Sequence, residues 1–544
     1  MANKIPTEIL TKILNNVQST EDLHSSLLVN RIWCKVTIPI LWELLLGQEC
    51  CTDDKKLRKK ALCIRTFISC TDTQARTLLS EYGFDLSSSP PQATFDYPSF
   101  IHKLIINNLV YFISIYSQQI IRPDQENNDS VDERTKSRIL FREICKLIIN
   151  RCSFLDYFKL ARVDKKFSRN FRLNLDSLSS STFLEDYKLS KVPMKNCERF
   201  TNYCDIIGSI LELPGAPKVF KKLESFTLII NEDEHLICPL YESLKFICDN
   251  ILNMDLKLNS DYQIRLLAKL ISAQKHLEKL SVLSNATLND LNCDPIFCAI
   301  INQKETLKIL HLKQVKFNGF KGRSSPNGQF ISLQELYIED WRGLDDSGCL
   351  SLASTFTQLS SFHYSCSKGT YRYPYPQEFV VRVLETANTN LRNICLDLCL
   401  TETFSAILDY CTKITQLTLY HLSLERVIAI LNNNFNELRI FSFSFIFGGE
   451  FDADLLLCQM AEYVPESLET IEFIIYNHTS WIFSANSLRK FFEGWCCKGE
   501  GNKKIIVKDN KRIVKSTEEQ QLFTLSDEHF KVIDEYGVQF DIKE

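Results

Sequence analysis

Short apolar runs of one recurring form mark the chain from residue 223 onwards. Each run reads L-x-x-L-x-L, with other apolar residues in place of some Leu, and polar or mixed residues stand at the alternate positions. Alternation with a period of two is typical of a half-buried β-strand. Ten runs begin at Leu223, Ile251, Leu277, Leu307, Leu333, Leu359, Leu391, Ile414, Leu438 and Leu468, with spacings of 28, 26, 30, 26, 26, 32, 23, 24 and 30 residues. This near-regular spacing predicts a tandem array of one structural unit.

The stretches between the runs carry apolar residues near a period of 3.6, as amphipathic helices do. The clearest are residues 262–272, 378–388, 404–411, 424–433 and 454–464. Each unit therefore contains a strand and a helix, and it needs a neighbour to bury its apolar face. We predict an α/β fold (α+β for the chain as a whole) in which these units stack into a curved solenoid of parallel strands and helices.

The runs resemble the leucine-rich-repeat motif LxxLxLxx(N/C). Four of the ten keep the final Asn or Cys, namely Asn231, Asn259, Asn285 and Cys399. In the motif this side chain satisfies backbone groups where the strand turns, so the other units are degenerate copies. Weaker copies at Ile101 and Leu155 lie 54 residues apart and extend the array upstream. The polar, aperiodic insert 122–137 accounts for their excess spacing and is predicted to be a loop.

The first 46 residues predict three short helices with more apolar surface than they can bury among themselves. The first helix follows Pro6 and presents one apolar face, made of Ile9, Leu10, Ile13, Leu14 and Val17. Ser19 is a plausible N-cap for the second helix, and the third holds Trp33 and ends near Trp42. Because domains this small rarely form a core alone, we expect a second polypeptide to cover the apolar face. The alternative is that this segment is a helical cap on the array.

This segment resembles an F-box. The residues that carry the resemblance are Ile5-Pro6-x-Glu8-Ile9-Leu10-x-x-Ile13-Leu14-x-x-Val17, Asp22-Leu23, Leu28-Val29-Asn30-Arg31-x-Trp33 and Leu41-Trp42. Its clearest departure is Ile5, where the family usually has Leu. The resemblance implies docking onto the Skp adaptor of a cullin-RING ubiquitin ligase, in or near residues Ile5, Pro6, Ile9, Leu10, Ile13, Leu28 and Trp33. On this hypothesis Leu10→Asp abolishes adaptor binding and leaves the array folded.

Together the patterns predict an F-box at 1–46, a helical connector at 47–97 and a solenoid at 98–510. The solenoid is degenerate before residue 221 and clear over 221–500, and residues 511–544 form a C-terminal cap or tail. This layout resembles the F-box/leucine-rich-repeat substrate receptors of SCF-type ubiquitin ligases, particularly fungal proteins with degenerate repeats. The resemblance implies a non-catalytic subunit that holds a target protein for ubiquitination. Two alternatives remain open: a non-degradative interaction scaffold, and an enzyme.

The composition of the chain bears on which classes of function are compatible with it. The chain has 544 residues, 45% of them hydrophobic and 24% charged, and its net charge of −4 gives no argument for binding nucleic acid. No apolar run reaches the roughly 18 residues that a membrane helix needs. The 21 cysteines are scattered and form no paired CxxC motifs, so we expect neither a metal site nor a cofactor, and a reducing cytoplasmic or nuclear location. The nine His form no catalytic triad, and no phosphate-binding loop is present.

The concave face of a repeat solenoid is the natural place for a target protein. Side chains alternate along a strand, so the positions between the conserved apolar residues face outward. The candidate substrate face comprises His311, Lys313, Tyr337, Glu339, His363, Asp397, Tyr420 and Glu472. Aromatic side chains on a rigid surface are reasonable contact residues. The alternative is an ordinary solvated polar strand face.

Overall fold

The computed structural model describes residues 5–17, 19–47, 60–84, 86, 93–120, 133–161, 210–229, 238–284, 291–316, 330–340, 347–366, 375–433, 435–445, 452–475, 483–497, 503–509 and 525–543. The chain divides into two compact units, Met1–Leu280 and Ser281–Glu544. The stretch from Arg122 to Asp132, and the motif residues Asn231 and Asn285, lie outside the described residues. Within the described ranges, no helix is both long and apolar enough to cross a bilayer.

Three helices open the first unit: α1 (Thr7–Asn15), α2 (Thr20–Leu27) and α3 (Arg31–Gly47). Side-chain caps fix the starts of α2 and α3. The Ser19 hydroxyl accepts a hydrogen bond from the Asp22 N–H, and the Asn30 side-chain oxygen accepts from the N–H groups of Ile32 and Trp33. The second cap is one that the sequence pattern did not reveal.

These helices bury a small core of their own and still leave apolar side chains exposed. Leu10, Leu14, Leu23 and Val36 are buried together, and Val17, Trp33, Ile40, Leu41 and Leu44 pack against them. Helix α3 supplies most of the residues that close this core, and it continues past the predicted end near Trp42 to Gly47. The long helix packs against both α1 and α2.

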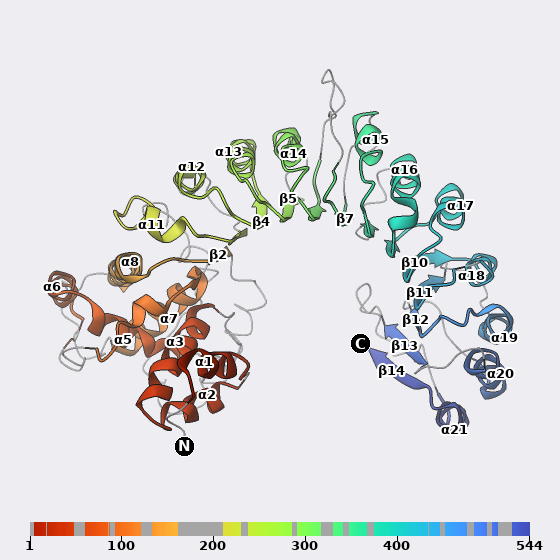
Figure 1. Ribbon diagram of the computed structural model, residues 1–544, viewed down its shortest axis with the longest axis horizontal. Helices are drawn as coiled ribbons and strands as arrows, with labels where there is room; N and C mark the ends of the chain where they lie inside the picture. Colours follow the sequence, from red (N-terminus) through yellow and green to blue (C-terminus); the bar gives the residue numbers. More distant parts are fainter. Residues whose placement is uncertain are drawn as a thin grey trace, which may run out of the picture. The chain divides into compact units, whose positions relative to one another are not determined.

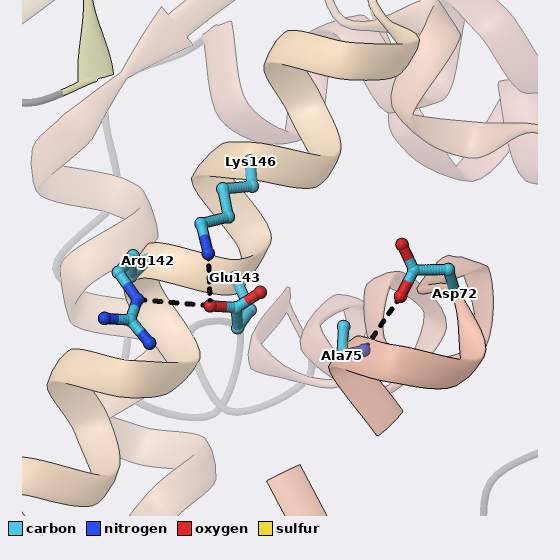
Figure 2. A network of polar contacts seen from close by, with 5 residues as sticks. All are labelled: Asp72, Ala75, Arg142, Glu143 and Lys146. Carbon is cyan, nitrogen blue, oxygen red and sulfur yellow. Dashed lines mark hydrogen bonds and ion pairs between the residues drawn. The ribbon is translucent and has the colours of Figure 1, made fainter. Parts of the chain in front are cut away.

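Helices α5 (Cys63–Cys70) and α6 (Thr73–Glu81) and the short 3-10 helix η2 (Tyr97–Phe100) follow. Asp72 caps α6 by accepting a hydrogen bond of 2.8 Å from the Ala75 N–H (Figure 2). The longer helices α7 (Ile106–Ile120) and α8 (Glu133–Arg151) come next. The prediction of a loop over 122–137 is wrong for its last five residues, because residues 133–137 belong to α8.

A buried carboxylate lies on α8. The Glu143 side chain is 7% exposed and accepts hydrogen bonds from Arg142 Nε at 3.1 Å and Lys146 Nζ at 2.9 Å (Figure 2). Both partners lie on the same helix, so the cluster neutralises the acid locally. These two ion pairs explain how the charged Glu143 side chain can be buried on a largely apolar helix face.

Four parallel strands of the first unit pair in chain order: β1 (Lys103–Ile105), β2 (Tyr157–Ala161), β3 (Ser225–Ile229) and β4 (Asn253–Leu258). The helices α11 (Ala216–Phe220), α12 (Cys238–Ile247) and α13 (Asp261–Ser272) alternate with them. The strands predicted from Ile101, Leu155, Leu223 and Ile251 are confirmed. Helix α3 packs against β1, where Glu43 and Lys103 form an ion pair of 2.8 Å.

Strand β5 (Lys279–Ser284) contains the boundary between the units. The second unit continues with strands β6 (Ile309–Lys313), β7 (Glu335–Glu339), β8 (Ser361–Ser365), β9 (Asn393–Leu396), β10 (Gln416–Leu422), β11 (Ile440–Phe445), β12 (Thr470–Ile475), β13 (Lys504–Asp509) and β14 (Gln539–Lys543). Consecutive strands from β6 to β14 pair with one another in parallel.

The helices of the second unit are α14 (Asp294–Ile301), α15 (Ser347–Ala353), α16 (Gln377–Ala387), α17 (Thr401–Tyr410), α18 (Leu424–Leu431), α19 (Ala453–Tyr463), α20 (Ala485–Cys496) and α21 (Asp527–Tyr536), with the 3-10 helix η4 (Asn388–Asn390). Within this unit the strands line the inner side of an arc and the helices its outer side (Figure 1). The α/β solenoid of parallel strands and helices, like that of leucine-rich-repeat proteins, is therefore confirmed.

The C-terminal end differs from the predicted cap. Ser526 does begin a helix, α21, in a capping box with His529, and Gly537 ends it with a φ of 61°. The chain then forms β14, which pairs in parallel with β13. Residues 504–543 thus include one further repeat unit, built from a sequence too divergent to match the motif.

Candidate partner-binding surfaces

One register row runs across the concave side of the second unit. We call it the central row; it consists of His311, Tyr337, His363, Cys395, Thr418, Ser442, Glu472, Ile506 and Asp541, each the register partner of the next. The sequence pattern placed the first seven of these at equivalent positions. Their direct pairing follows from equal motif phases in neighbouring parallel strands.

Three rings of the central row form a contiguous cluster. The centroids of His311 and Tyr337 lie 4.2 Å apart in an edge-to-face arrangement, and those of Tyr337 and His363 lie 5.7 Å apart, nearly stacked. Burial lowers the pKa of His363 and raises the pKa of Tyr337, because each charged form loses hydration. The Tyr337 and His363 rings are therefore held in their neutral forms, and such rings favour flat or apolar contact groups.

The ring cluster is flanked by an ion pair. Lys313 and Glu339 are register partners, and the lysine Nζ lies 2.7 Å from the Glu339 carboxylate. The Lys313 side chain is 46% exposed and that of Glu339 is 35% exposed, so a ligand can reach both. Breaking such a partly exposed ion pair costs little free energy. The predicted residues Lys313, Tyr337, Glu339, His311 and His363 thus lie together on β6, β7 and β8.

The remaining predicted residues lie apart from this cluster. The Asp397 carboxylate accepts a hydrogen bond of 2.9 Å from the Cys366 N–H, just beyond the ends of β8 and β9. Tyr420 lies at an irregularity of β10, where the register with β11 shifts between Leu419 and Leu422. At His421 the backbone turns to a φ of 58°, and its N–H donates to Ser444 Oγ. Even spacing of the motif would make Tyr420 the register partner of Ser444. Because of the irregularity, the two residues are not in register.

In the middle of the concave side, the outward-facing positions of β10 and β11 are buried. Ser442 and Ser444 are completely buried, and Thr418 is nearly so. Glu472 lies over this region: its Oε2 accepts hydrogen bonds of 2.6 Å from both Ser442 Oγ and Lys508 Nζ. A side chain held by two donors is a structural cover, and Glu472 is a poor candidate for target binding.

A second surface is apolar and lies on the N-terminal helices. Ile9 and Ile13 lie four residues apart on the outer side of α1 and are 47% and 48% exposed, and Ile5, just before the helix, is 40% exposed. Leu28 is 88% exposed at the end of α2, and Val29 and Ile32 beside it are also exposed. Val29 and Ile32 lie within the F-box-like segment, but its sequence pattern does not tell which of the apolar residues face outward.

Two predicted docking residues point inward. Leu10 is 1% exposed and belongs to the internal core, so it is not available for direct contact in this chain. Trp33 packs against the same core. Its indole N–H is buried without a hydrogen-bond acceptor among the described residues. Pro6 is exposed at the start of α1.

The sixteen cysteines whose side chains the structure describes form no disulfide with one another, and half of them are buried. Burial raises the pKa of several thiols, for example that of Cys395 to about 12, so they stay protonated and unreactive at neutral pH. In the described part of the chain, no three His, Cys, Asp or Glu side chains are grouped to hold a metal ion.

Comparison with known proteins adds little. No family model and no curated protein matches the chain. Among solved structures, it is similar to the leucine-rich-repeat-containing protein LegL7 from Legionella pneumophila, with 13% sequence identity and a TM-score of 0.32 over 58% of this chain and 90% of that one. The repeat architecture therefore rests on the strands and helices of this chain itself.

Proposed function

We propose that this chain is a protein-interaction scaffold that acts as the substrate receptor of an SCF-type ubiquitin ligase. The N-terminal helices dock the Skp adaptor, and through it a cullin, while the concave side of the repeats binds a target protein. The chain contributes no bond-making chemistry. Tethering the target raises its effective concentration near the enzyme that transfers ubiquitin.

The observation that carries this proposal is the apolar surface on α1. Three isoleucines at every fourth position remain exposed, although the three helices already have an internal core in Leu10, Leu14 and Leu23. About half of each isoleucine side chain is still exposed, and covering that remaining half is worth about 1 kcal/mol each, roughly half of the value for full burial. The F-box resemblance of the same residues supports the Skp adaptor as the occupant.

The ring cluster of His311, Tyr337 and His363 supports the target-binding role. It combines rigid rings with the adjacent Lys313–Glu339 ion pair, on neighbouring strands of the concave side. Clustered aromatic groups edged by charges are typical of energetically important interface residues. Free cysteines support a reducing compartment, such as the cytoplasm or nucleus, as the place of action.

Binding of the purified Skp adaptor to the full chain tests the docking step. We expect Ile9→Asp combined with Ile13→Asp to abolish binding, because two charges would be desolvated at the interface. Leu455→Asp is the control, since Leu455 on α19 is 45% exposed and the change likewise puts a carboxylate at a half-exposed apolar position. Equal binding by the double variant and wild type would contradict the proposal.

Reconstitution then separates a ligase receptor from a non-degradative scaffold. The complete cullin-RING assembly is given a bound target with and without this chain, and ubiquitin transfer is measured. Transfer that requires the chain, and is lost with the Ile9 and Ile13 substitutions, supports the receptor. Adaptor binding without any transfer to bound partners would favour the scaffold.

A further inference from the structure

The outward-facing positions of β7 carry two carboxylates with an aromatic ring between them. Glu335, Tyr337 and Glu339 alternate along the strand, so their side chains leave the sheet on the same side. The residues between them, Leu336 and Ile338, are buried in the core. The Tyr337 side chain therefore projects from the concave side with an acidic residue before it and another after it.

The two carboxylates differ in their partners. Glu339 is neutralised by Lys313, whose Nζ lies 2.7 Å from its carboxylate. Glu335 accepts a hydrogen bond of 3.2 Å from the Tyr337 hydroxyl, and within the described residues no basic side chain forms an ion pair with it. A hydroxyl donor leaves the negative charge in place. Glu335 is thus an acid without a basic counterpart, held next to the Tyr337 side chain.

The rings beside Glu335 form a flat surface. Tyr337 lies between His311 and His363, at centroid distances of 4.2 and 5.7 Å. Burial lowers the pKa of His363, because its charged form loses hydration, so this ring stays neutral at neutral pH. A cation that approaches the Tyr337 ring is therefore attracted by Glu335 and is not repelled by His363.

We propose that the ring cluster and Glu335 together bind an arginine side chain of the target protein, an inference that rests on the proposed target-binding role of the concave side. The guanidinium group stacks on the Tyr337 ring, and its N–H groups donate to the Glu335 carboxylate. Guanidinium fits both features, because it is planar, keeps its charge and presents several N–H donors in one plane. A lysine ammonium supplies the charge without the flat surface, and an apolar side chain would desolvate Glu335 without giving it a partner.

Binding of a single arginine to the full chain tests this assignment. The probe is N-acetylarginine amide, titrated against the chain and observed by saturation-transfer NMR, which detects weak ligands. Two comparison ligands are N-acetylcitrulline amide, which keeps the shape and lacks the charge, and N-acetyllysine amide with a free ε-amino group. We expect the arginine ligand to bind about fivefold or more tightly than either, since hydrogen bonds to charged groups are the stronger ones.

Three variants locate the binding. Glu335→Gln removes the charge and keeps the shape of the side chain, and it should weaken binding of the arginine ligand about fivefold. Tyr337→Leu removes the stacking surface and should also weaken it. Glu469→Gln is the matched control, because Glu469 is exposed at the start of β12 and the change is the same; binding should equal that of wild type. Circular dichroism checks folding, and Glu335→Gln keeps the test informative if Tyr337→Leu does not fold.

Equal binding of the arginine and citrulline ligands would overturn the proposal, and so would unchanged arginine binding by Glu335→Gln. A lysine ligand that binds as tightly as the arginine ligand would show that charge alone is recognised, and would also overturn it. These measurements do not involve the Skp adaptor. Ile9→Asp with Ile13→Asp should leave arginine binding unchanged, so failure of this site and failure of adaptor docking are distinguishable.

Discussion

Gly494 of α20 lies against Ala461 of α19 at a distance that leaves no room for a side chain. A Cβ at position 494 would stand 2.2 Å from the Ala461 carbonyl oxygen and 2.8 Å from its Cα. Both atoms belong to backbone, so neither can rotate away. The spacing of these two outer helices is therefore set by the absence of a Cβ.

Gly494→Ala should destabilise the second unit. Helix propensity alone would make Ala about 1 kcal/mol more favourable than Gly in a helix interior. The steric overlap with Ala461 opposes this gain, and overpacking typically costs about 1–3 kcal/mol. We expect a net loss in urea unfolding, whereas Lys490→Ala, at an exposed position of the same helix, should change stability by about 0.5 kcal/mol at most. A Gly494→Ala variant more stable than wild type would contradict the close approach.

Leu10→Ala and Ile9→Ala should separate folding from docking. Leu10 fills the core of the N-terminal helices, and truncating such a residue costs about 2–5 kcal/mol. Ile9 is half exposed, and its truncation should have little effect on stability. Hydrogen exchange of the α1–α3 amides should therefore accelerate in Leu10→Ala only. If the exchange rates of the two variants match, the inward and outward faces of α1 are misassigned.

Glu472→Ala should cost more than Glu339→Ala, although both remove a glutamate from the concave side. Glu472 accepts from the buried Ser442 hydroxyl, so its loss leaves a buried donor unsatisfied, at about 1–3 kcal/mol. Glu339 forms an exposed pair with Lys313, and such pairs contribute about 0–1 kcal/mol. Urea unfolding of the two variants measures this difference. Equal losses would show that Glu472 is not a structural cover.

Lys503 should make stability depend on alkaline pH. Its Nζ donates to the Leu468 and Glu466 carbonyls, next to the Trp495 ring, and burial lowers its pKa below the ordinary 10.5. Between the lowered pKa and 10.5 the unfolded state binds more protons than the folded state, so stability rises with pH in that window. Below the window Lys503 carries its charge in both states, and the burial penalty is fully present.

The difference in unfolding free energy between wild type and Lys503→Met isolates this effect, because the other titrating groups are common to both. We expect that difference to shift in favour of wild type as the pH rises toward 10. A difference that is constant over this range would mean that the Lys503 pKa is not lowered by burial.

The repeat pattern by itself predicted strands β1 to β12 and the helices α13, α16, α17, α18 and α19. Runs such as those at Leu307 and Leu333 specify which side chains face the core, because alternation in a strand and a period of 3.6 in a helix are local properties. Equal motif phase also determined the central row, since parallel strands with the same phase bring equivalent residues into register. The grouping of His311, Tyr337 and His363 followed from that rule.

Only the tertiary structure decided which apolar and polar residues stay exposed. Leu10 and Ile9 are neighbours in sequence, yet packing against α2 and α3 buries Leu10 and leaves Ile9 about half exposed. Ser442 and His363 occupy equivalent positions, but Glu472 covers the serine. Exposure depends on what packs from elsewhere in the chain, and a local pattern carries no record of it.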